Sequence, residues 1–199
     1  MPINFKALKS GQAIPLTTTL TITLIKQADL IDIIQMFDNP NVTQYLFFAP
    51  APVEVYQDFF TPIIDNTQSA IEAEKWPDNP TIIIRDHNGR FMGMAGLPAV
   101  MFLEGNYEVG YQLPEYAWGQ GIASAACQLL THLAFTELDA HKITADCYRS
   151  NIGSYKTMEK CGFVLEGTQQ DYFKLGNKFD DRVFYGITKT QFQAMSSCD

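Results

Sequence analysis

Residues 107–124 read Tyr-Glu-Val-Gly-Tyr-Gln-Leu-Pro-Glu-Tyr-Ala-Trp-Gly-Gln-Gly-Ile-Ala-Ser. The first part, Tyr107–Leu113, alternates large side chains with Glu, Gly and Gln, which is the pattern of a strand. Pro114 ends that strand because proline has no N–H for a further strand bond. Apolar residues at helical spacing begin at Ile122. The residues between the two patterns, Trp118–Ala123, therefore predict a tight strand-to-helix turn.

This turn has the chemistry of an anion site. Gly119 and Gly121 let the backbone turn without a Cβ in the way. The first N–H groups of the following helix have no partner within it and carry the positive end of its dipole, so they can hold a phosphate or pyrophosphate. A plain connection without a ligand fits as well. A dinucleotide-binding fold is an alternative, because Asp139 lies about twenty residues after the turn, where the ribose-binding acid of that fold would be. Two features oppose it: Ser124 stands where that fingerprint has its third glycine, and most of the predicted strands precede the turn.

Two further motifs follow the turn. Asn151-Ile-Gly-Ser154 opens a second predicted helix, and Glu159-Lys-Cys-Gly-Phe163 closes it. In this order, together with the Gly110-Tyr111 strand and the turn, they resemble the GNAT superfamily of acetyl-CoA-dependent N-acetyltransferases. Within it they are most similar to the Rim-type branch, which acetylates the N-termini of ribosomal proteins. The resemblance covers roughly residues 15–190.

The resemblance implies an α/β fold of the mixed α+β kind. We expect a single GNAT-type domain with a central, mostly antiparallel twisted sheet flanked by helices, and a splayed strand pair that holds the cofactor. A length of 199 residues also suits one domain. We expect a loose leader over 1–15, the domain over 16–193 and a flexible tail over 194–199. The other predicted elements are strands within 16–25, 81–85, 91–97, 141–147, 163–166, 170–175 and 182–187, and helices over 29–37, 53–75 (broken at Thr61-Pro62), 122–136 and 151–161.

Composition excludes several classes of function. The formal net charge is −8 and no run of Lys or Arg stands out, so we expect no nucleic-acid partner and a mild preference for a cationic acceptor. No apolar stretch is long enough for a signal core or a membrane span, so we expect a cytoplasmic protein without a membrane partner. A homodimer is compatible with the sequence. The four cysteines and three histidines are not spaced as metal ligands, so we expect no metal site and expect the thiols to be reduced. These residues are Cys127, Cys147, Cys161, Cys198, His87, His132 and His141.

The resemblance implies acetyl-CoA as cosubstrate. Backbone N–H groups of the turn would bind the pyrophosphate, and the backbone of Tyr111–Leu113 would meet the pantetheine and the thioester carbonyl. Asn151 would hydrogen-bond the pantetheine arm, which is compatible with a second role as a helix N-cap. Trp118 suits plain packing as well as cofactor contact. The expected cofactor-binding residues are Tyr111, Gln112, Leu113, Trp118, Gly119, Gln120, Gly121, Ile122, Ala123, Ser124, Asn151 and Ser154.

The sequence departs from the family at the usual proton donor. Many GNAT enzymes carry a tyrosine just before the Glu-Lys of the second helix, and here that position is Met158, which cannot donate a proton. Ser154 matches the serine with that task in the Rim-type branch, and capping of the first helical turn is its alternative role. Tyr155 and Tyr172 are further candidate donors.

Two carboxylates are candidates for the general base. Glu108 lies on the strand beside the expected acetyl site, and Glu166 matches a glutamate implicated in the Rim-type branch. Either could instead be a solvated charge at a sheet edge. Aromatic residues in the first half could line an acceptor pocket or belong to the core: Tyr45, Phe47, Phe48, Tyr56, Phe59 and Phe60.

The expected function is therefore transfer of an acetyl group from acetyl-CoA to a primary amine, with a protein N-terminus as the first acceptor to test. A small-amine or antibiotic N-acetyltransferase is the first alternative. A CoA-binding or sensing module that has lost turnover is the second, and Met158 keeps it open.

Overall fold

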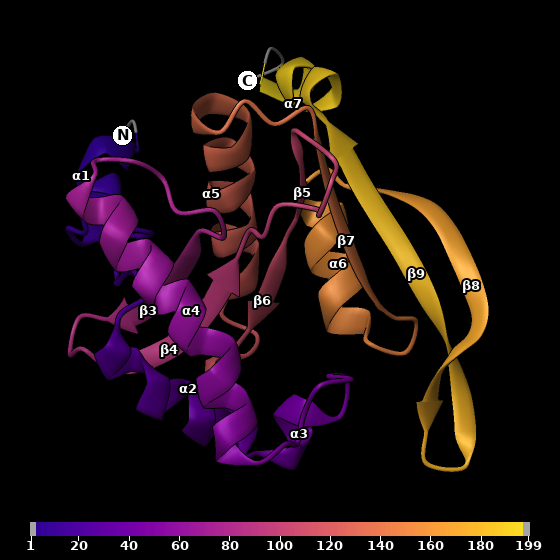
Figure 1. Ribbon diagram of the computed structural model, residues 1–199. Helices are drawn as coiled ribbons and strands as arrows, with labels where there is room; N and C mark the ends of the chain where they lie inside the picture. The colour runs from indigo at the N-terminus through magenta and orange to yellow at the C-terminus, as the bar shows by residue number, and fades with distance from the viewer. Residues whose placement is uncertain (1–2, 197–199) are drawn as a thin grey trace.

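The computed structural model describes residues 3–196 (Figure 1). In those residues the chain forms two sheets flanked by helices, and one strand pair, β5 with β7, is parallel. The elements are α1 (Phe5–Lys9), β1 (Ile14–Pro15), β2 (Leu20–Leu24), η1 (Gln27–Asp29), α2 (Leu30–Phe37), α3 (Pro40–Thr43), α4 (Val53–Glu72), β3 (Thr81–Asp86), β4 (Phe91–Gly96), β5 (Asn106–Glu108), β6 (Gly110–Gln112), η2 (Glu115–Ala117), α5 (Ile122–Glu137), β7 (Lys142–Tyr148), α6 (Ile152–Lys160), β8 (Val164–Leu175), β9 (Lys178–Thr188) and α7 (Lys189–Ser196).

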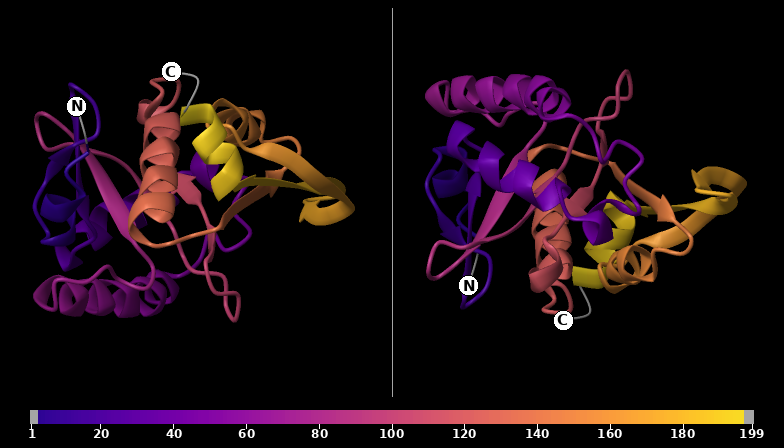
Figure 2. Two further views of the ribbon diagram at one scale, coloured as in Figure 1. Left: turned by 90° about the horizontal axis from the view of Figure 1, so that it is seen from above. Right: turned by 90° about the horizontal axis from the view of Figure 1, so that it is seen from below.

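The first sheet has the order β1-β2-β3-β4-β6, and its strands β3 and β4 are buried on both faces. The three isoleucines of β3 show why, because successive side chains of a strand point to opposite faces. Ile82 and Ile84 join one core cluster, which includes the buried face of α5, and Ile83 joins another, which includes α2 and α4. The two sets of helices accordingly lie on opposite sides of the strands (Figure 2).

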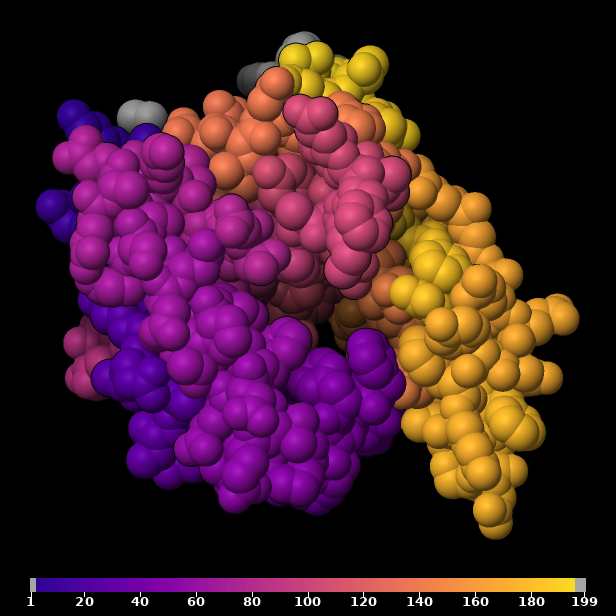
Figure 3. Space-filling model, viewed as in Figure 1, coloured from indigo at the N-terminus to yellow at the C-terminus, as the bar shows by residue number. Residues whose placement is uncertain are grey.

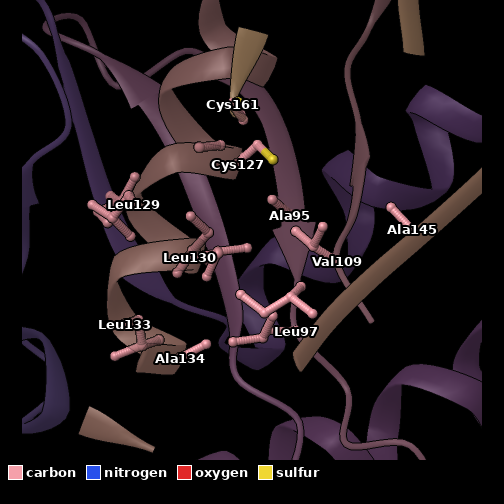
Figure 4. Close-up of a cluster of buried hydrophobic side chains, with 14 of the residues drawn as sticks. Ala95, Leu97, Val109, Cys127, Leu129, Leu130, Leu133, Ala134, Ala145 and Cys161 are labelled. Atoms are coloured by element: carbon pink, nitrogen blue, oxygen red, sulfur yellow. The ribbon is translucent and has the colours of Figure 1, made fainter. Parts of the chain in front are cut away.

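The larger core lies where α5 packs on β4 and β6. Leu130 and Leu133 are fully buried, and Leu130 points from α5 toward Leu97 (Figure 4). Ala126 and Ala134 on the same helix allow a close approach of helix and sheet. Burial of each leucine contributes roughly 1.5–3 kcal/mol, so this face fixes the start of α5 firmly against the sheet.

The second sheet has the order β5-β7-β9-β8 and shares one continuous strand segment with the first. The chain over 106–112 begins in the second sheet as β5 and continues in the first sheet as β6, with Val109 between them. The expected mixed fold with a splayed strand pair is therefore confirmed, and the single strand predicted over Tyr107–Leu113 is divided between two sheets.

Several expected boundaries are wrong. Residues 5–9 are helical and bury Phe5 and Leu8, so the leader expected to be loose is packed against the core. The break expected at Thr61-Pro62 does not occur. α4 continues through Pro62, because its buried residues form one stripe along a continuous helix. The strands expected over 163–166 and 170–175 are one bulged strand, β8.

The C-terminal segment also differs from the expectation. The chain forms α7 over Lys189–Ser196, where a tail from residue 194 was expected, and residues 197–199 lie outside the described part. β3 and β4 form a hairpin whose turn contains Asn88-Gly89, with Gly89 at φ 79°. Over residues 3–196, no helix combines the length and apolar character needed to cross a membrane.

Candidate active site

The central feature of the site is a wedge between β6 and β7. In β5, Glu108 pairs with Thr144 of β7, and the Val109 N–H donates a 2.9 Å hydrogen bond to the Thr144 carbonyl oxygen. Beyond this point β6 pairs with β4, and β7 pairs with β9. Two backbone edges therefore face each other without pairing. Such edges can hydrogen-bond an extended chain that carries amide groups.

A close backbone contact holds the far end of β6 in place. Gly93 of β4 has φ 137°, and a Cβ there would lie 2.2 Å from the Leu113 side chain and 2.7 Å from the Gln112 carbonyl oxygen. Only glycine allows this approach. It places Gln112 and Leu113, both expected to bind the cofactor, at the end of the wedge.

The turn after β6 presents unpaired backbone donors. Gly119 and Gly121 have φ 73° and 75°, and a Cβ at either would meet nothing within 4 Å. Gly121 is the N-cap of α5 and offers no side-chain acceptor to the helix. Within residues 3–196, the backbone N–H groups of residues 119–124 donate no hydrogen bond. These N–H groups, at the positive end of α5, form an open cradle that fits a pyrophosphate.

The side chains of this turn have structural partners. Trp118 donates its indole N–H to the Leu113 carbonyl oxygen at 2.9 Å, and Gln120 donates its amide N–H to the Tyr116 carbonyl oxygen at 2.8 Å. Both contacts tie the turn to the preceding segment. The Trp118 side chain therefore fixes the turn, and any cofactor contact from it would come from the ring surface, since the residue is 43% exposed.

The start of α6 forms the opposite wall of the wedge. Asn151 is the N-cap of α6, and its Oδ1 accepts the Ser154 N–H at 3.2 Å. Tyr111 of β6 donates its hydroxyl proton to the Ser154 carbonyl oxygen at 2.9 Å, and its Oη lies 3.3 Å from Ser154 Oγ. A phenol has one proton, so in the second contact the serine is the donor. Burial raises the pKa of Tyr111 well above its usual range, which keeps this phenol protonated.

The Ser154 hydroxyl has a second polar neighbour in Cys147 of β7. The two side chains hydrogen-bond, and burial raises the pKa of the Cys147 thiol to about 11. The thiol is therefore protonated at neutral pH. Ser154 thus lies between a phenol and a thiol, both protonated, on the side of the wedge next to α6.

The other candidate donors are differently placed. Met158 is 2% exposed and belongs to the core, so it takes no part in proton transfer. Tyr155 packs parallel to Tyr185 at a ring separation of 6.5 Å. Tyr172 lies on β8, where its hydroxyl accepts a 3.2 Å hydrogen bond from Arg182. Among the candidate acids Ser154, Tyr155 and Tyr172, Ser154 is the one that contacts Tyr111 of β6.

The face of the second sheet that points away from α6 is open and polar. We call it the open face. It carries Glu108 of β5, every second residue of β7 and their partners on β9, and its members are Glu108, Thr144, Asp146, Tyr148, Arg182 and Phe184. Glu108 therefore lies on the side of the sheet opposite Ser154, next to the point where β5 leaves β7.

Glu108 has an altered proton affinity. Reduced hydration of its carboxylate raises its pKa, the charge of Asp146 raises it further, and Arg182 acts in the opposite direction. Asp146 is itself bound by Arg182 through two hydrogen bonds, each 2.7 Å long. A carboxylate with a raised pKa is better matched to accept a proton near neutral pH than an ordinary one.

Glu166, the second candidate base, is engaged elsewhere. It forms an ion pair with Lys142 and lies over Gly186, where a Cβ would come within 2.6 Å of its carboxylate. Gly186 pairs with Thr144, and Thr144 pairs with Glu108, so both carboxylates lie over the same face, two strand spacings or roughly 10 Å apart by backbone. The bound cation makes Glu166 the less available base.

The segment around α3 bridges the two sides of the wedge. Asn39 and Asn41 donate to the Glu115 carboxylate near the end of β6, at 3.0 Å each. Tyr45 donates to the Ser150 carbonyl oxygen beyond β7 at 3.4 Å. Figure 3 shows a hollow between this segment, the loop before β5 and the β8–β9 hairpin.

The six aromatic residues expected near the acceptor divide into three groups. Tyr56 and Phe60 are buried in the core against Phe37, so they are not acceptor residues. Tyr45 packs on Tyr148 of the open face with ring centroids 5.6 Å apart. The remaining three are exposed, and Phe48 still contacts Phe37: Phe47, Phe48 and Phe59.

Sequence reasoning missed two relationships in the site. The Tyr111 side chain was expected near the cofactor through its backbone only, and its bond to Ser154 depends on the packing of α6. The Asp146–Arg182 pair was not expected either. Alternation along β7 would have placed Asp146 on the same face as Thr144, but the β7–β9 register is needed to bring Arg182 to it.

Three of the four cysteines lie in the described residues. Cys127, Cys147 and Cys161 are buried and unpaired, while Cys198 lies outside the described part. Across residues 3–196, no group of three or more His, Cys, Asp or Glu residues is arranged to hold a metal ion.

Known proteins resemble this chain in sequence and in fold. The family model described as acetyltransferase (GNAT) domain matches residues 19–164. An uncharacterized N-acetyltransferase of Bacillus licheniformis, p20, is 27% identical over 177 residues, which covers 88% of this chain and 96% of that protein. The matched family region contains the wedge, the cradle and the start of α6.

Two solved structures share the fold. The spermidine N-acetyltransferase from Vibrio cholerae, in complex with CoA and spermine, has a TM-score of 0.75 at 21% identity and covers 89% of this chain and 99% of that chain. RimL, the ribosomal L7/L12 alpha-N-protein acetyltransferase in complex with coenzyme A, has a TM-score of 0.73 at 22% identity. The match covers 89% of this chain and 98% of that chain. Because the family domain spans most of the chain, including the elements that build the wedge, this protein belongs to the GNAT acetyltransferase family and is an N-acetyltransferase.

Proposed function

We propose that this enzyme transfers an acetyl group from acetyl-CoA to a primary amine, and that a protein N-terminus is its acceptor. The observation that carries the proposal is the wedge itself. Its unpaired backbone edges end at the N–H cradle of residues 119–124, and Ser154 and Glu108 lie on its two sides. One face can therefore receive a thioester and the other an amine.

The cofactor contacts follow from the free backbone groups. Acetyl-CoA would supply the acetyl group as a thioester. The N–H groups over 119–124 suit its pyrophosphate, and the unpaired edge of Tyr111–Leu113 suits the amides of pantetheine. Asn151 keeps its side-chain N–H₂ group for a further acceptor, because only its Oδ1 is used in the cap.

The two sides of the wedge support two proton-handling roles. Glu108, with its raised pKa, would accept a proton from the incoming ammonium group directly or through a water molecule. Ser154 would hold, at Oγ, the proton that a leaving thiolate needs, and the protonated Tyr111 phenol beside it restricts where that hydroxyl can point. Fixed positions of both groups lower the entropic cost of the reaction, which is a large part of catalysis in acyl transfer between two bound substrates.

The choice of a protein N-terminus rests on the Rim-type motif Asn151-x-x-Ser154 and on the fold shared with RimL. A polyamine acceptor is the second candidate, because the spermidine N-acetyltransferase from Vibrio cholerae shares the fold equally well. A sensing module without turnover is the less favoured candidate, since a candidate donor, Ser154, and a candidate base, Glu108, lie beside the wedge.

The test is a thiol-release assay. Purified protein is incubated with acetyl-CoA, first alone and then with N-terminal peptides, polyamines or aminoglycosides, and the products are identified by mass spectrometry. We expect release that depends on the acceptor and a product acetylated at the α-amine of a peptide. Binding of acetyl-CoA in calorimetry without release for any acceptor would favour the sensing module. Absence of binding would contradict the proposal as a whole.

A further inference from the structure

Cys147 is a buried thiol of β7 that has no part in the proton transfers described so far. It lies on the same side of the strand as Ile143 and Ala145, which are also buried. Its sulfur contacts the first turn of α6 at two points, the Ser154 side chain and the Tyr155 backbone N–H. The thiol is therefore fixed directly beside the candidate proton donor.

The direction of each hydrogen bond around Ser154 follows from a count of protons. The Tyr111 hydroxyl lies 2.9 Å from the Ser154 carbonyl oxygen, which can only accept, so the phenol proton is used there. The Ser154 hydroxyl must then donate its own proton to Tyr111 Oη, 3.3 Å away. The proton for the third contact therefore comes from the S–H of Cys147, which donates to Ser154 Oγ.

The backbone of α6 holds the Cys147 sulfur in this orientation. A backbone N–H can only donate, so the sulfur accepts the hydrogen bond from Tyr155. The single proton of the thiol is then left for Ser154. Burial raises the pKa of Cys147 to about 11, so the thiol keeps this proton at neutral pH.

The contact matters because a hydroxyl is a weak acid. When Ser154 gives its proton to the leaving thiolate, the Oγ–H bond breaks and the S–H bond of free CoA forms. Oγ keeps the electron pair and a negative charge until it recovers a proton from solvent. Donors that already point at such an oxygen stabilise the transition state. Within residues 3–196, the Cys147 S–H is in that position, whereas the Tyr111 proton is held by the carbonyl oxygen.

We infer, on the basis of the proposed function, that Cys147 is a positioning residue for Ser154. Its S–H occupies one acceptor site of Oγ, which leaves the serine proton for donation, and it stabilises the charge that forms on Oγ. This support suits a chain in which Met158, buried in the core, stands where related enzymes carry a tyrosine as donor.

The first experiment separates this role from packing. Cys147→Ala removes the donor and Cys147→Ser keeps one. Cys127→Ala is the matched control, because Cys127 is also buried but contacts Cys161 and Thr131 rather than Ser154. Thiol release is followed with the most active amine from the panel of peptides, polyamines and aminoglycosides, and thermal unfolding is measured for each variant.

We expect Cys147→Ala to lower kcat about ten-fold without a change in KM for acetyl-CoA, and the other two variants to keep most of kcat. The loss is smaller than the roughly 100-fold or more that follows removal of a strong oxyanion donor, because S–H is a weak donor. An unchanged kcat in Cys147→Ala, or an equal loss in Cys127→Ala, would overturn the inference.

The second experiment tests whether Cys147 acts through Ser154. Cys147→Ala is combined with Ser154→Ala, and kcat of the double variant is compared with that of Ser154→Ala alone. We expect no further loss, because the hydroxyl that the thiol supports is already absent. A further ten-fold loss, as large as in the original protein, would show that the thiol acts independently of the serine and contradict the inference.

A spectroscopic measurement tests the contact in the protein without cofactor. The S–H stretching band of cysteine lies in a region of the Raman spectrum that is free of other protein bands, and its frequency falls when the thiol donates a hydrogen bond. Difference spectra against Cys147→Ser isolate the band of Cys147 in each background. We expect Ser154→Ala to raise the frequency of this band. An unshifted band would mean that the thiol does not donate to Ser154, which removes the basis of the inference.

The outcomes distinguish this inference from the proposed function. Silence with every amine would overturn the proposed function and the inference together. Acetyl transfer that is insensitive to Cys147→Ala would overturn the inference alone, while the acetyltransferase activity stands. Transfer with the expected loss, the rescue by Cys147→Ser and the shifted S–H band would together support both.

Discussion

Tyr111 of β6 donates a 2.9 Å hydrogen bond to the carbonyl oxygen of Ser154 in the first turn of α6. The two residues come from opposite walls of the wedge. Because β6 and β7 do not pair there, this bond is a direct tie between the strand that leaves the second sheet and the helix that carries the candidate proton donor. The spacing of the wedge and the direction of the Ser154 hydroxyl are therefore linked.

Removal of the Tyr111 hydroxyl should disturb catalysis more than cofactor binding. Tyr111→Phe deletes both hydrogen bonds of the phenol to Ser154, each of which contributes about 1 kcal/mol to stability. We expect kcat to fall about ten-fold, since small displacements of a reacting group are costly, while the dissociation constant of acetyl-CoA changes little. Steady-state kinetics and calorimetry measure the two effects. An unchanged kcat with a lowered melting temperature would show that Tyr111 has a structural role only.

Ser154→Ala should lower kcat by roughly 100-fold, the lower range for loss of a general acid. Ser154→Thr is the matched control, because it keeps a hydroxyl at the same position and should retain much more activity. Single-turnover measurements isolate the chemical step from product release. Normal turnover in Ser154→Ala would remove this residue from the mechanism and leave Tyr155 or Tyr172 as donors.

Glu108 should determine the acidic limb of the pH–rate profile. Its pKa is raised by reduced hydration and by Asp146, so kcat/KM should fall, as the pH is lowered, at a higher pH than an ordinary glutamate would cause. Asp146→Asn should move this limb to lower pH, because it removes a negative neighbour and frees Arg182 to attract the Glu108 carboxylate.

The control for this prediction is the other candidate base. Glu108→Gln should abolish the limb and most of the activity, whereas Glu166→Gln should keep both, since Glu166 is held by Lys142. A profile that loses its limb in Glu166→Gln would exchange the roles of the two residues. The raised pKa also means that the contribution of Glu108 to folding stability decreases as the pH rises from its unfolded-state pKa through its folded-state pKa.

Gly121→Ala should weaken cofactor binding beyond its effect on stability. The residue has φ 75°, so any side chain strains the backbone by about 1 kcal/mol, although a Cβ there would meet no other atom within 4 Å. Gly89→Ala is a matched control, because Gly89 has φ 79° and is equally open but lies in the β3–β4 hairpin. We expect similar losses of stability in both variants and weaker acetyl-CoA binding in Gly121→Ala alone. Equal affinities in calorimetry would contradict the assignment of the cradle.

Pro62→Ala should stabilise the protein. Pro62 lies inside α4, where proline lacks the N–H of a helical hydrogen bond at a cost of about 3 kcal/mol, and its side chain is exposed. Alanine restores the bond but gives the unfolded chain more freedom, so we expect a net gain of about 2 kcal/mol in the free energy of unfolding. Denaturant unfolding measures it. A loss of stability would indicate that the proline fixes a bend that the packing of α4 requires.

Local patterns in the sequence were sufficient for most elements. Alternation identified the strand over Tyr107–Leu113, and two glycines before an apolar helix identified the turn. Asn151 at the start of a helix predicted the N-cap that the structure contains. These features depend on contacts between residues close in the chain, so the sequence by itself determined them, together with the fold that four ordered motifs imply.

The tertiary structure decided what depends on register and packing. One strand is divided between two sheets at Val109 because its first part, β5, pairs with β7 and its second part, β6, pairs with β4. β4 precedes this segment in the chain and β7 follows it, so the sequence around Val109 does not reveal the division. Propensity placed a helix break at Pro62, but the buried stripe of α4 outweighed it. The difference between Glu108 and Glu166 also appeared only here. A carboxylate's proton affinity depends on its neighbours in space, and Lys142 and Asp146 reach these two glutamates only through the sheet.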